Sequence, residues 1–204
     1  MNTKGCPLCL FAHCKHLGHG FGRNYYHCPQ CELVHVPQSE HVSKEREKQE
    51  YDLHENSEVS QSYCCYLSTV ADEIDTIDLK EPKVLDFGSC EEYVLTKILR
   101  QRGYDCSPYD PLYDLPLPTV PASYDIVVLC EVIEHLRKLR KELKLVKSLL
   151  NKGGVLYIRT QFYGQVEEVK SWWYANDVTH INFFNEESLR YVAQLLDGQL
   201  YEHD

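Results

Sequence analysis

Two cysteine pairs near the start of the chain have the residue types and spacing of a metal site. Cys6-Pro-Leu-Cys9 and Cys28-Pro-Gln-Cys31 are separated by 18 residues. Each pair places two thiolates on one tight turn, and two such turns supply the four tetrahedral ligands that zinc prefers. Because all four ligands would be thiolates, no position is left for a reacting water molecule. The spacing therefore predicts a structural Zn²⁺ ion held by Cys6, Cys9, Cys28 and Cys31.

Other sulfur and nitrogen ligands lie nearby in the sequence, but they lack the paired-turn geometry. These residues, which we interpret as loop residues, are His13, Cys14, His16 and His19. The alternative that the four paired cysteines are buried and bind no metal is less favoured by their spacing. No apolar run is long enough to span a bilayer, and the first residues do not resemble a signal peptide. We therefore expect a cytoplasmic protein, in which clustered cysteines point to metal binding and not to disulfides.

The overall charge limits the kinds of partner. The chain has 21 basic and 31 acidic residues and a formal net charge of −10. Such a chain is a poor electrostatic match for nucleic acid, and its first forty residues contain no basic patch. We therefore expect a small-molecule substrate, no membrane, and nucleic acid only as a disfavoured partner.

The elements that must position these residues fall into three regions. A zinc ribbon is expected to include hairpin strands at Tyr25–Tyr26 and Leu33–Val34. A polar segment, Glu40–Asn56, is predicted to form a solvated helix, and apolar residues at helical spacing predict a second helix over Tyr63–Ile77. The predicted domains are a zinc ribbon at 1–39, a helical linker and cap at 40–80, and an α/β domain at 81–204.

The third region alternates strands and helices. A Rossmann-like, doubly wound parallel sheet is the fold that this order predicts. Only about a dozen residues join its second and third strands, so the fold is a shortened one. The predicted strands are Val84–Gly88, Tyr104–Tyr109, Tyr124–Leu129 and Val155–Thr160, and the predicted helices are Glu91–Arg102 and Arg137–Leu150.

Several of these segments carry a family resemblance. They resemble the successive motifs of class I S-adenosylmethionine-dependent methyltransferases, and the matching segments are Val84–Gly88, Tyr124–Val128, Glu131–Leu136 and Gly153–Leu156. More narrowly, Tyr51–Asn56 and Trp172–His180 are similar to signatures of a bacterial group in which a four-cysteine zinc ribbon precedes the methyltransferase domain. This group implies no settled substrate.

The resemblance implies S-adenosylmethionine as cofactor and assigns residues to it. Asp86 and Gly88, with Ser89 beside them, would border the methionine part of the cofactor. Asp110 would hold the ribose hydroxyls, since a carboxylate can accept both hydrogen bonds. Cys130 and Glu131 would lie beside the cofactor.

The resemblance also assigns polar residues to the methyl acceptor. The residues expected to contact the substrate are Tyr51, His54, Asn56 and Tyr174. Methyl transfer depends mainly on holding the acceptor near the methyl group, and a base is needed only if the acceptor must lose a proton. His180 is the first candidate base and His135 the second, because imidazole titrates near neutral pH. Asp177 completes the catalytic set, while an alternative role for His135 is to order the start of a helix.

The loop after the first strand departs from the family pattern. Cys90 and Glu92 stand where glycines normally let backbone N–H groups approach the cofactor. Ser89-Cys90-Glu91-Glu92 also fits a capping box, in which the serine and glutamate side chains satisfy the free N–H groups at a helix start. A helix start closed in this way has fewer donors left for a ligand.

Two functions follow from these observations. The first is an enzyme that transfers a methyl group from S-adenosylmethionine to an unidentified small molecule. The alternative is a catalytically degenerate, methyltransferase-like scaffold that uses its zinc ribbon for protein contacts. Zinc-assisted RNA methylation is a third possibility, but the acidic charge counts against it. The shortened sheet leaves one edge that a protein partner or a second copy of the chain could cover.

Overall fold

The computed structural model describes residues 5–53, 57–117 and 124–201. The chain forms two compact units. The knuckle unit consists of Met1–Glu47, Ile133–Leu145 and Thr160–Asp204, and the sheet unit consists of Lys48–Val132 and Val146–Arg159. The predicted domain boundaries remain a prediction, because contacts group segments in space and do not mark where a family domain begins.

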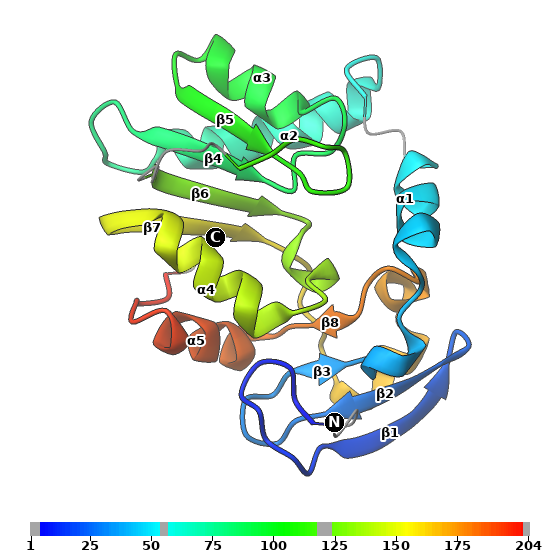
Figure 1. Cartoon of the computed structure of the whole chain (residues 1–204). Helices are drawn as coiled ribbons and strands as arrows, with labels where there is room; N and C mark the ends of the chain where they lie inside the picture. The colour runs from blue at the N-terminus through cyan, green and yellow to red at the C-terminus, as the bar shows by residue number, and fades with distance from the viewer. Residues whose placement is uncertain (1–4, 54–56, 118–123, 202–204) are drawn as a thin grey trace. The chain divides into compact units, whose positions relative to one another are not determined.

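Four parallel strands form the centre of the sheet unit, as expected for a Rossmann-like α/β fold. Figure 1 shows them side by side in the order β5-β4-β6-β7. Their bounds are β4 (Lys83–Phe87), β5 (Asp105–Tyr109), β6 (Tyr124–Cys130) and β7 (Leu150–Arg159). The apolar run of β6, residues 126–129, is completely buried. Burial on both faces is typical of a central parallel strand, so the predicted sheet is confirmed.

Two helices pack against this sheet through one hydrophobic core. Helix α2 (Gln61–Asp75) confirms the predicted second helix, and α3 (Val94–Gln101) follows β4. The core combines residues from both helices with side chains from three strands. Its buried members are Leu67, Val70, Ala71, Ile74, Val84, Val94, Leu95, Leu99, Cys106, Ile126 and Val128. This packing holds the carboxyl ends of β4, β5 and β6 at one edge of the sheet, where ligands of such folds bind.

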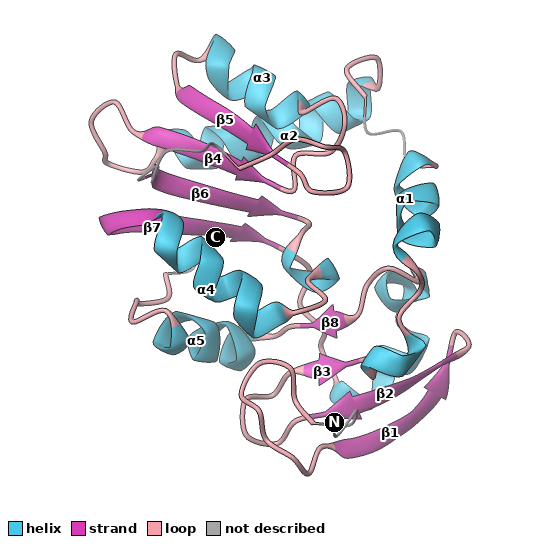
Figure 2. Ribbon diagram, in the orientation of Figure 1, coloured by secondary structure: helices cyan, strands magenta, loops and turns pink. Residues whose placement is uncertain are grey.

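The knuckle unit has an antiparallel sheet of its own, visible among the strands in Figure 2. Its order is β1-β2-β3-β8, with β1 (Lys15–Gly20), β2 (Arg23–His27), β3 (Val34–His35) and β8 (Asn182–Phe183). The predicted hairpin is confirmed. His16 and His19 lie in β1, so their interpretation as loop residues was wrong. The sequence did not indicate β8, in which Phe183 pairs with Val34.

Helical segments complete the chain. They are α1 (Lys44–Asp52), α4 (Leu139–Leu149), α5 (Glu186–Leu195) and the 3-10 helices η1 (Gln38–Glu40), η2 (Ile133–His135), η3 (Val166–Ser171) and η4 (Trp173–Asn176). Helix α1 is shorter than the predicted Glu40–Asn56, and it is not wholly solvated. Glu47 is 6% exposed, and its carboxylate accepts a hydrogen bond from Nε of Arg137 at 2.8 Å.

Candidate functional site

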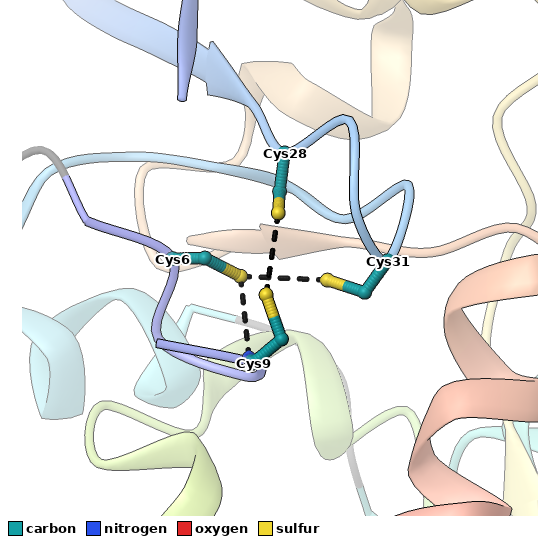
Figure 3. A group of neighbouring side chains, drawn as sticks. All are labelled: Cys6, Cys9, Cys28 and Cys31. Atoms are coloured by element: carbon teal, nitrogen blue, oxygen red, sulfur yellow. Dashed lines mark hydrogen bonds between the residues drawn. The ribbon is translucent and has the colours of Figure 1, made fainter. Parts of the chain in front are cut away.

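The four paired cysteines converge on one point, with their sulfur atoms turned toward one another (Figure 3). The Sγ atoms of Cys6 and Cys31 are 3.4 Å apart, and those of Cys9 and Cys28 are 3.3 Å apart. All four sulfur atoms lie within 4.8 Å of one another. Four thiols at this spacing fit one tetrahedral Zn²⁺ ion of the structural kind.

The two cysteine turns share one backbone pattern. The amide of Cys6 donates to Phe11 O and the amide of Cys28 donates to Leu33 O, both at 2.9 Å. At matching positions, Leu10 and Glu32 have positive φ angles of 68° and 57°. Each turn therefore forms the same backbone knuckle. This shared backbone positions the two thiols of each turn, although the other side chains differ. Cys14 is not one of the four converging residues; its thiol bonds to Phe11 O at 3.7 Å.

The loop after β4 adopts a strained, closely packed backbone. Gly88 has a φ of +85°, and a Cβ atom there would lie 2.5 Å from a methyl carbon of Val132. Only glycine fits both conditions. Cys90, which stands at a family glycine position, also has a positive φ of 58°. The loop therefore has left-handed backbone at Cys90 although the residue there is not glycine.

The capping box predicted at Ser89–Glu92 does not form. Helix α3 begins at Val94, later than the predicted Glu91, and its N-cap has no side-chain hydrogen bond. Ser89 Oγ is buried and has no partner among the described residues, while Glu92 accepts the amide of Glu58 at 3.0 Å. The left-handed Cys90 interrupts the turn that a capping box requires, so the loop is not closed on its own helix start.

Asp86, on β4, caps the start of helix α3 in place of the predicted capping box. Its Oδ2 accepts hydrogen bonds from the amide of Thr96 at 3.1 Å and from its hydroxyl at 2.8 Å. Thr96 is the third residue of α3, one of the positions whose amide has no partner within a helix. The carboxylate is 3% exposed, and burial raises its pKa to about 6. Asp86 therefore fixes the start of α3 against the end of β4.

Asp110 ties the loop to the end of β5. Its Oδ2 accepts the amide of Cys90 at 3.0 Å, and its Oδ1 accepts the amide of Leu112 at 2.9 Å. It is 5% exposed, and burial raises the pKa of its carboxyl above the ordinary value. Because each carboxylate oxygen accepts more than one hydrogen bond, both keep acceptor capacity that ribose hydroxyls require.

At the end of β6, Cys130 is followed by Glu131, which has a left-handed φ of 52°. Its Oε1 accepts a hydrogen bond from the hydroxyl of Tyr66 on α2 at 2.7 Å. The Arg159 guanidinium lies 5.6 Å from the centre of the Tyr66 ring and bonds to Glu73. Tyr66 entered the sequence reasoning only as part of an apolar stripe, because periodicity does not show what a tyrosine hydroxyl binds.

Tyr174 and the three predicted catalytic residues lie close together in the knuckle unit, around the half-buried His135 and the buried His180. We call Glu134, His135, Tyr174, Asp177 and His180 the polar cluster. The rings of His135 and His180 are 4.6 Å apart between centroids, and those of Tyr174 and His180 are 4.0 Å apart. Glu134 was not assigned a role in the sequence, yet it is completely buried and accepts the Tyr174 hydroxyl. Its position within the Glu131–Leu136 motif is the sequence feature that could have indicated a role for Glu134.

Asp177 lies beside His180 in this cluster. Its Oδ2 is 3.7 Å from His180 Nε2, and its Oδ1 accepts the amide of Thr179 at 2.8 Å. Burial alone would raise the pKa of the Asp177 carboxyl, but His180 and the hydrogen bonds from Thr179 lower it below the ordinary value. Asp177 is therefore suited to stabilise a positive charge on His180.

Arg23 on β2 holds the loop that carries these residues. It is 5% exposed, and its guanidinium donates to the backbone carbonyls of four residues at 2.6–2.9 Å. These residues are Ala175, Asp177, Val178 and His180. Sequence reasoning counted Arg23 only as a charge, although its two-residue spacing from the buried Tyr25 places both on one face of the strand.

Not every predicted site residue can be placed. His54 and Asn56 lie outside the described residues, and Tyr51 lies half-buried in α1 of the sheet unit. The six predicted cofactor residues all belong to the sheet unit, and the predicted catalytic residues and Tyr174 all belong to the knuckle unit.

Within the described residues, no helix combines the length and apolar character needed to cross a membrane.

Comparisons with known proteins give a family match and a match to a solved structure. A family model described as a methyltransferase domain matches residues 57–199. A solved structure of coclaurine N-methyltransferase, bound to N-methylheliamine and S-adenosylhomocysteine, matches with 13% identity and a TM-score of 0.44. The match covers 68% of this chain and 50% of that one. No curated protein matches. Because the family model covers more than half of the chain, this protein belongs to the methyltransferase-domain family, with a four-cysteine cluster near its N-terminus.

Proposed function

We propose that this protein transfers the methyl group of S-adenosylmethionine to a small-molecule acceptor. The observation that carries the proposal is the loop after β4. It keeps left-handed backbone at Gly88 and Cys90, and Asp110 binds it at the end of the next strand. The degenerate-scaffold alternative was based on the glycine replacements at Cys90 and Glu92 and on a capping box at Ser89–Glu92, and of these grounds the capping box is absent. Ser89 Oγ instead remains a buried hydroxyl without a described partner, which a bound cofactor could use.

The residues of the sheet unit fit the cofactor by chemistry. Asp110 supplies carboxylate oxygens for the ribose hydroxyls, and Glu131 supplies a carboxylate at the end of β6. Gly88 keeps the loop backbone free of a side chain, and a Cβ atom there would lie 2.5 Å from Val132. S-adenosylmethionine, when bound, supplies a methyl group on a positively charged sulfur. The methyl–sulfur bond would break as the acceptor's lone pair forms a bond to the methyl carbon, and S-adenosylhomocysteine would leave.

The polar cluster fits the needs of an acceptor that must lose a proton. Nδ1 of His180 donates to Tyr174 O at 2.7 Å, so Nε2 is the nitrogen that can take up a proton. Asp177, next to Nε2, would stabilise the resulting imidazolium. We assign His180 as the first candidate for this role and His135 as the second, with Tyr51, His54, Asn56 and Tyr174 as proposed substrate contacts. The acidic net charge favours a neutral or cationic small molecule over nucleic acid.

The four cysteines are proposed to hold a structural Zn²⁺ ion. Their sulfur spacing and the repeated knuckle backbone support this assignment, and a four-thiolate set leaves no open position for substrate. A protein partner or homodimer remains a prediction, based on the shortened sheet.

Calorimetric titration with S-adenosylmethionine and S-adenosylhomocysteine tests the function. We expect one binding site per chain and weaker binding by Asp110→Asn. The loss should be roughly 10- to 150-fold, because a hydrogen bond to a charged group contributes about 1.5–3 kcal/mol. Asp105→Asn is the matched control, since Asp105 lies exposed at the start of β5, the strand that Asp110 follows. Absence of binding at millimolar ligand would reject the enzyme and favour the scaffold.

A further inference from the structure

Three ligand groups in the polar cluster lie close enough to share one ion. Glu134, His135 and His180 each offer one ligand atom, and these atoms all lie within 4.8 Å of one another. We call these three residues the Glu–His–His cluster. It contains no thiol, so it differs in chemistry from the four-cysteine site.

The hydrogen bonds of the two histidines fix which nitrogen is the donor. Nδ1 of His135 lies 3.1 Å from Thr179 O, and Nδ1 of His180 lies 2.7 Å from Tyr174 O. A carbonyl oxygen can only accept, so both Nδ1 atoms carry hydrogen in the neutral rings, and both Nε2 atoms have the lone pair. Metal-binding histidines characteristically donate their second N–H to a backbone carbonyl or a carboxylate in this way.

The carboxylate of the cluster is also held in place. Oε1 of Glu134 accepts the Tyr174 hydroxyl, and Oε2 accepts the Thr160 hydroxyl at 3.2 Å. Glu134 is completely buried and His180 is 8% exposed. A buried carboxylate is stabilised by hydrogen bonds, by pairing, or by a metal ion, and ligating carboxylates are typically hydrogen-bonded themselves.

We propose that Glu134, His135 and His180 bind one divalent transition-metal ion. Two imidazoles and one carboxylate form a ligand set suited to Mn²⁺, Fe²⁺, Co²⁺ or Zn²⁺, and three protein ligands leave positions open. Asp177, near Nε2 of His180, is a further carboxylate beside the ion. If the proposed methyl transfer is correct, an acceptor oxygen bound to this ion would lose its proton to a water molecule more readily, and His180 would then act as a ligand instead of a free base.

Mn²⁺ titration of the full-length protein, with its zinc content measured beforehand, tests the site. Mn²⁺ prefers oxygen and nitrogen ligands, so it should not compete for the four thiolates. Excess Mg²⁺ in the buffer occupies exposed carboxylates without binding imidazole well. We expect one Mn²⁺ per chain in addition to the zinc, detected by the electron paramagnetic resonance signal of free Mn²⁺.

Matched variants locate the ion. His135→Gln and His180→Gln should each weaken Mn²⁺ binding by more than about 100-fold, the upper end of the loss caused by removing an outer partner. Tyr174→Phe removes only such an outer partner of Glu134 and should weaken binding by about 10- to 100-fold. His41→Gln makes the same chemical change in the knuckle unit outside the cluster and should leave binding unchanged.

Two results would overturn the proposal: a wild-type protein that binds no Mn²⁺, Co²⁺ or Zn²⁺ beyond the four-cysteine ion, or histidine variants that bind Mn²⁺ as the wild type does. If a histidine variant does not fold, as judged by its zinc content and circular dichroism, Mn²⁺ binding by Tyr174→Phe tests the proposal in its place. Binding of S-adenosylmethionine is measured separately. Failure of the metal site would therefore leave the proposed methyl transfer standing, and failure of cofactor binding would leave the metal site standing.

Discussion

Gly88 and Val132 approach so closely that the loop after β4 has no space for a side chain. A Cβ atom at Gly88 would lie 2.5 Å from Val132, and its φ of +85° strains any other residue. We expect Gly88→Ala to destabilise the fold by about 1–3 kcal/mol, the usual cost of overpacking. Urea unfolding measures this change. Gly164→Ala is the control, because among the described residues, its chain neighbours aside, no atom lies within 4 Å of a Cβ there. Equal stability losses in both variants would contradict the prediction.

A variant of Ser89 distinguishes a role in stability from a role in ligand binding. Its buried hydroxyl has no partner among the described residues, so Ser89→Ala should leave the free energy of unfolding unchanged or raise it slightly. If the hydroxyl serves the cofactor, the same variant should bind S-adenosylmethionine about 2- to 10-fold more weakly, since a neutral hydrogen bond contributes about 0.5–1.5 kcal/mol. Calorimetry and urea unfolding give the two values. A variant that loses stability without losing affinity would assign Ser89 to the fold.

The Asp86 carboxyl makes stability depend on pH. Its pKa rises from 3.8 to about 6 on folding, so the folded state binds the proton more tightly than the unfolded state. The stability it confers is complete below pH 4 and is lost as the pH rises through 6. Ionisation of Asp86 then lowers the free energy of unfolding by up to about 3 kcal/mol, since a pKa shift of one unit corresponds to about 1.4 kcal/mol.

Asp86→Asn tests this dependence, because an amide oxygen can still accept both hydrogen bonds from Thr96. Relative to the wild type, the variant should gain stability as the pH rises from 4 to 6. Unfolding by urea at several pH values gives the comparison. Parallel stability curves for the two proteins over this range would show that Asp86 titrates normally.

At the scale of elements, strand β2 positions the loop of the polar cluster through one side chain. Lysine cannot replace Arg23, because its compact ammonium group cannot reach four carbonyls in the geometry of a planar guanidinium. We expect Arg23→Lys to cost about 2–4 kcal/mol in urea unfolding, because several charge-assisted hydrogen bonds are lost. Mn²⁺ binding should weaken as well. Arg190→Lys, at a half-exposed surface ion pair, should change stability by less than about 0.5 kcal/mol.

The elements also show where sequence reasoning succeeds and where it stops. The knuckles and the parallel strands were predictable because their signals are local: paired cysteines, and apolar runs such as Ile126–Leu129. The capping box at Ser89 was a local signal as well, but tertiary structure overrode it when Asp86 reached Thr96 from the neighbouring strand. Glu134 and Tyr66 were present in predicted segments, yet the partners of their polar atoms come from distant parts of the chain.

At the scale of the whole molecule, the resemblance to methyltransferases was confirmed by the family match over residues 57–199. The pairing of β3 with β8 was not predicted. Strand β8 is two residues long and has no alternation that would distinguish it from a loop. Its partner lies far away in the sequence, and no single-chain pattern indicates such a pair. The residues assigned to cofactor and acceptor remain predictions that the proposed titrations test.

If the four cysteines bind zinc as proposed, removing the ion should affect residues far from the cysteines. We expect chelation to reduce amide protection together in β1, β2, β3 and β8, because these strands share one sheet. The amides of β4 and β6 serve as the internal control and should keep their protection. Hydrogen exchange with and without chelator measures both groups. Unchanged protection at Asn182–Phe183 in the zinc-free protein would show that β8 is held independently of the metal.

The same β3–β8 pairing sets an order of events during synthesis. Val34 leaves the ribosome long before its partner Phe183, and 148 residues lie between the two in the chain. At a synthesis rate of about 5–20 residues per second, β8 is made roughly 7–30 seconds after β3. The sheet of the knuckle unit is incomplete until then. During this interval the edge of β3 is exposed to other nascent chains. Early zinc binding would keep the cysteine turns folded through this wait and limit the exposed edge to a single short strand.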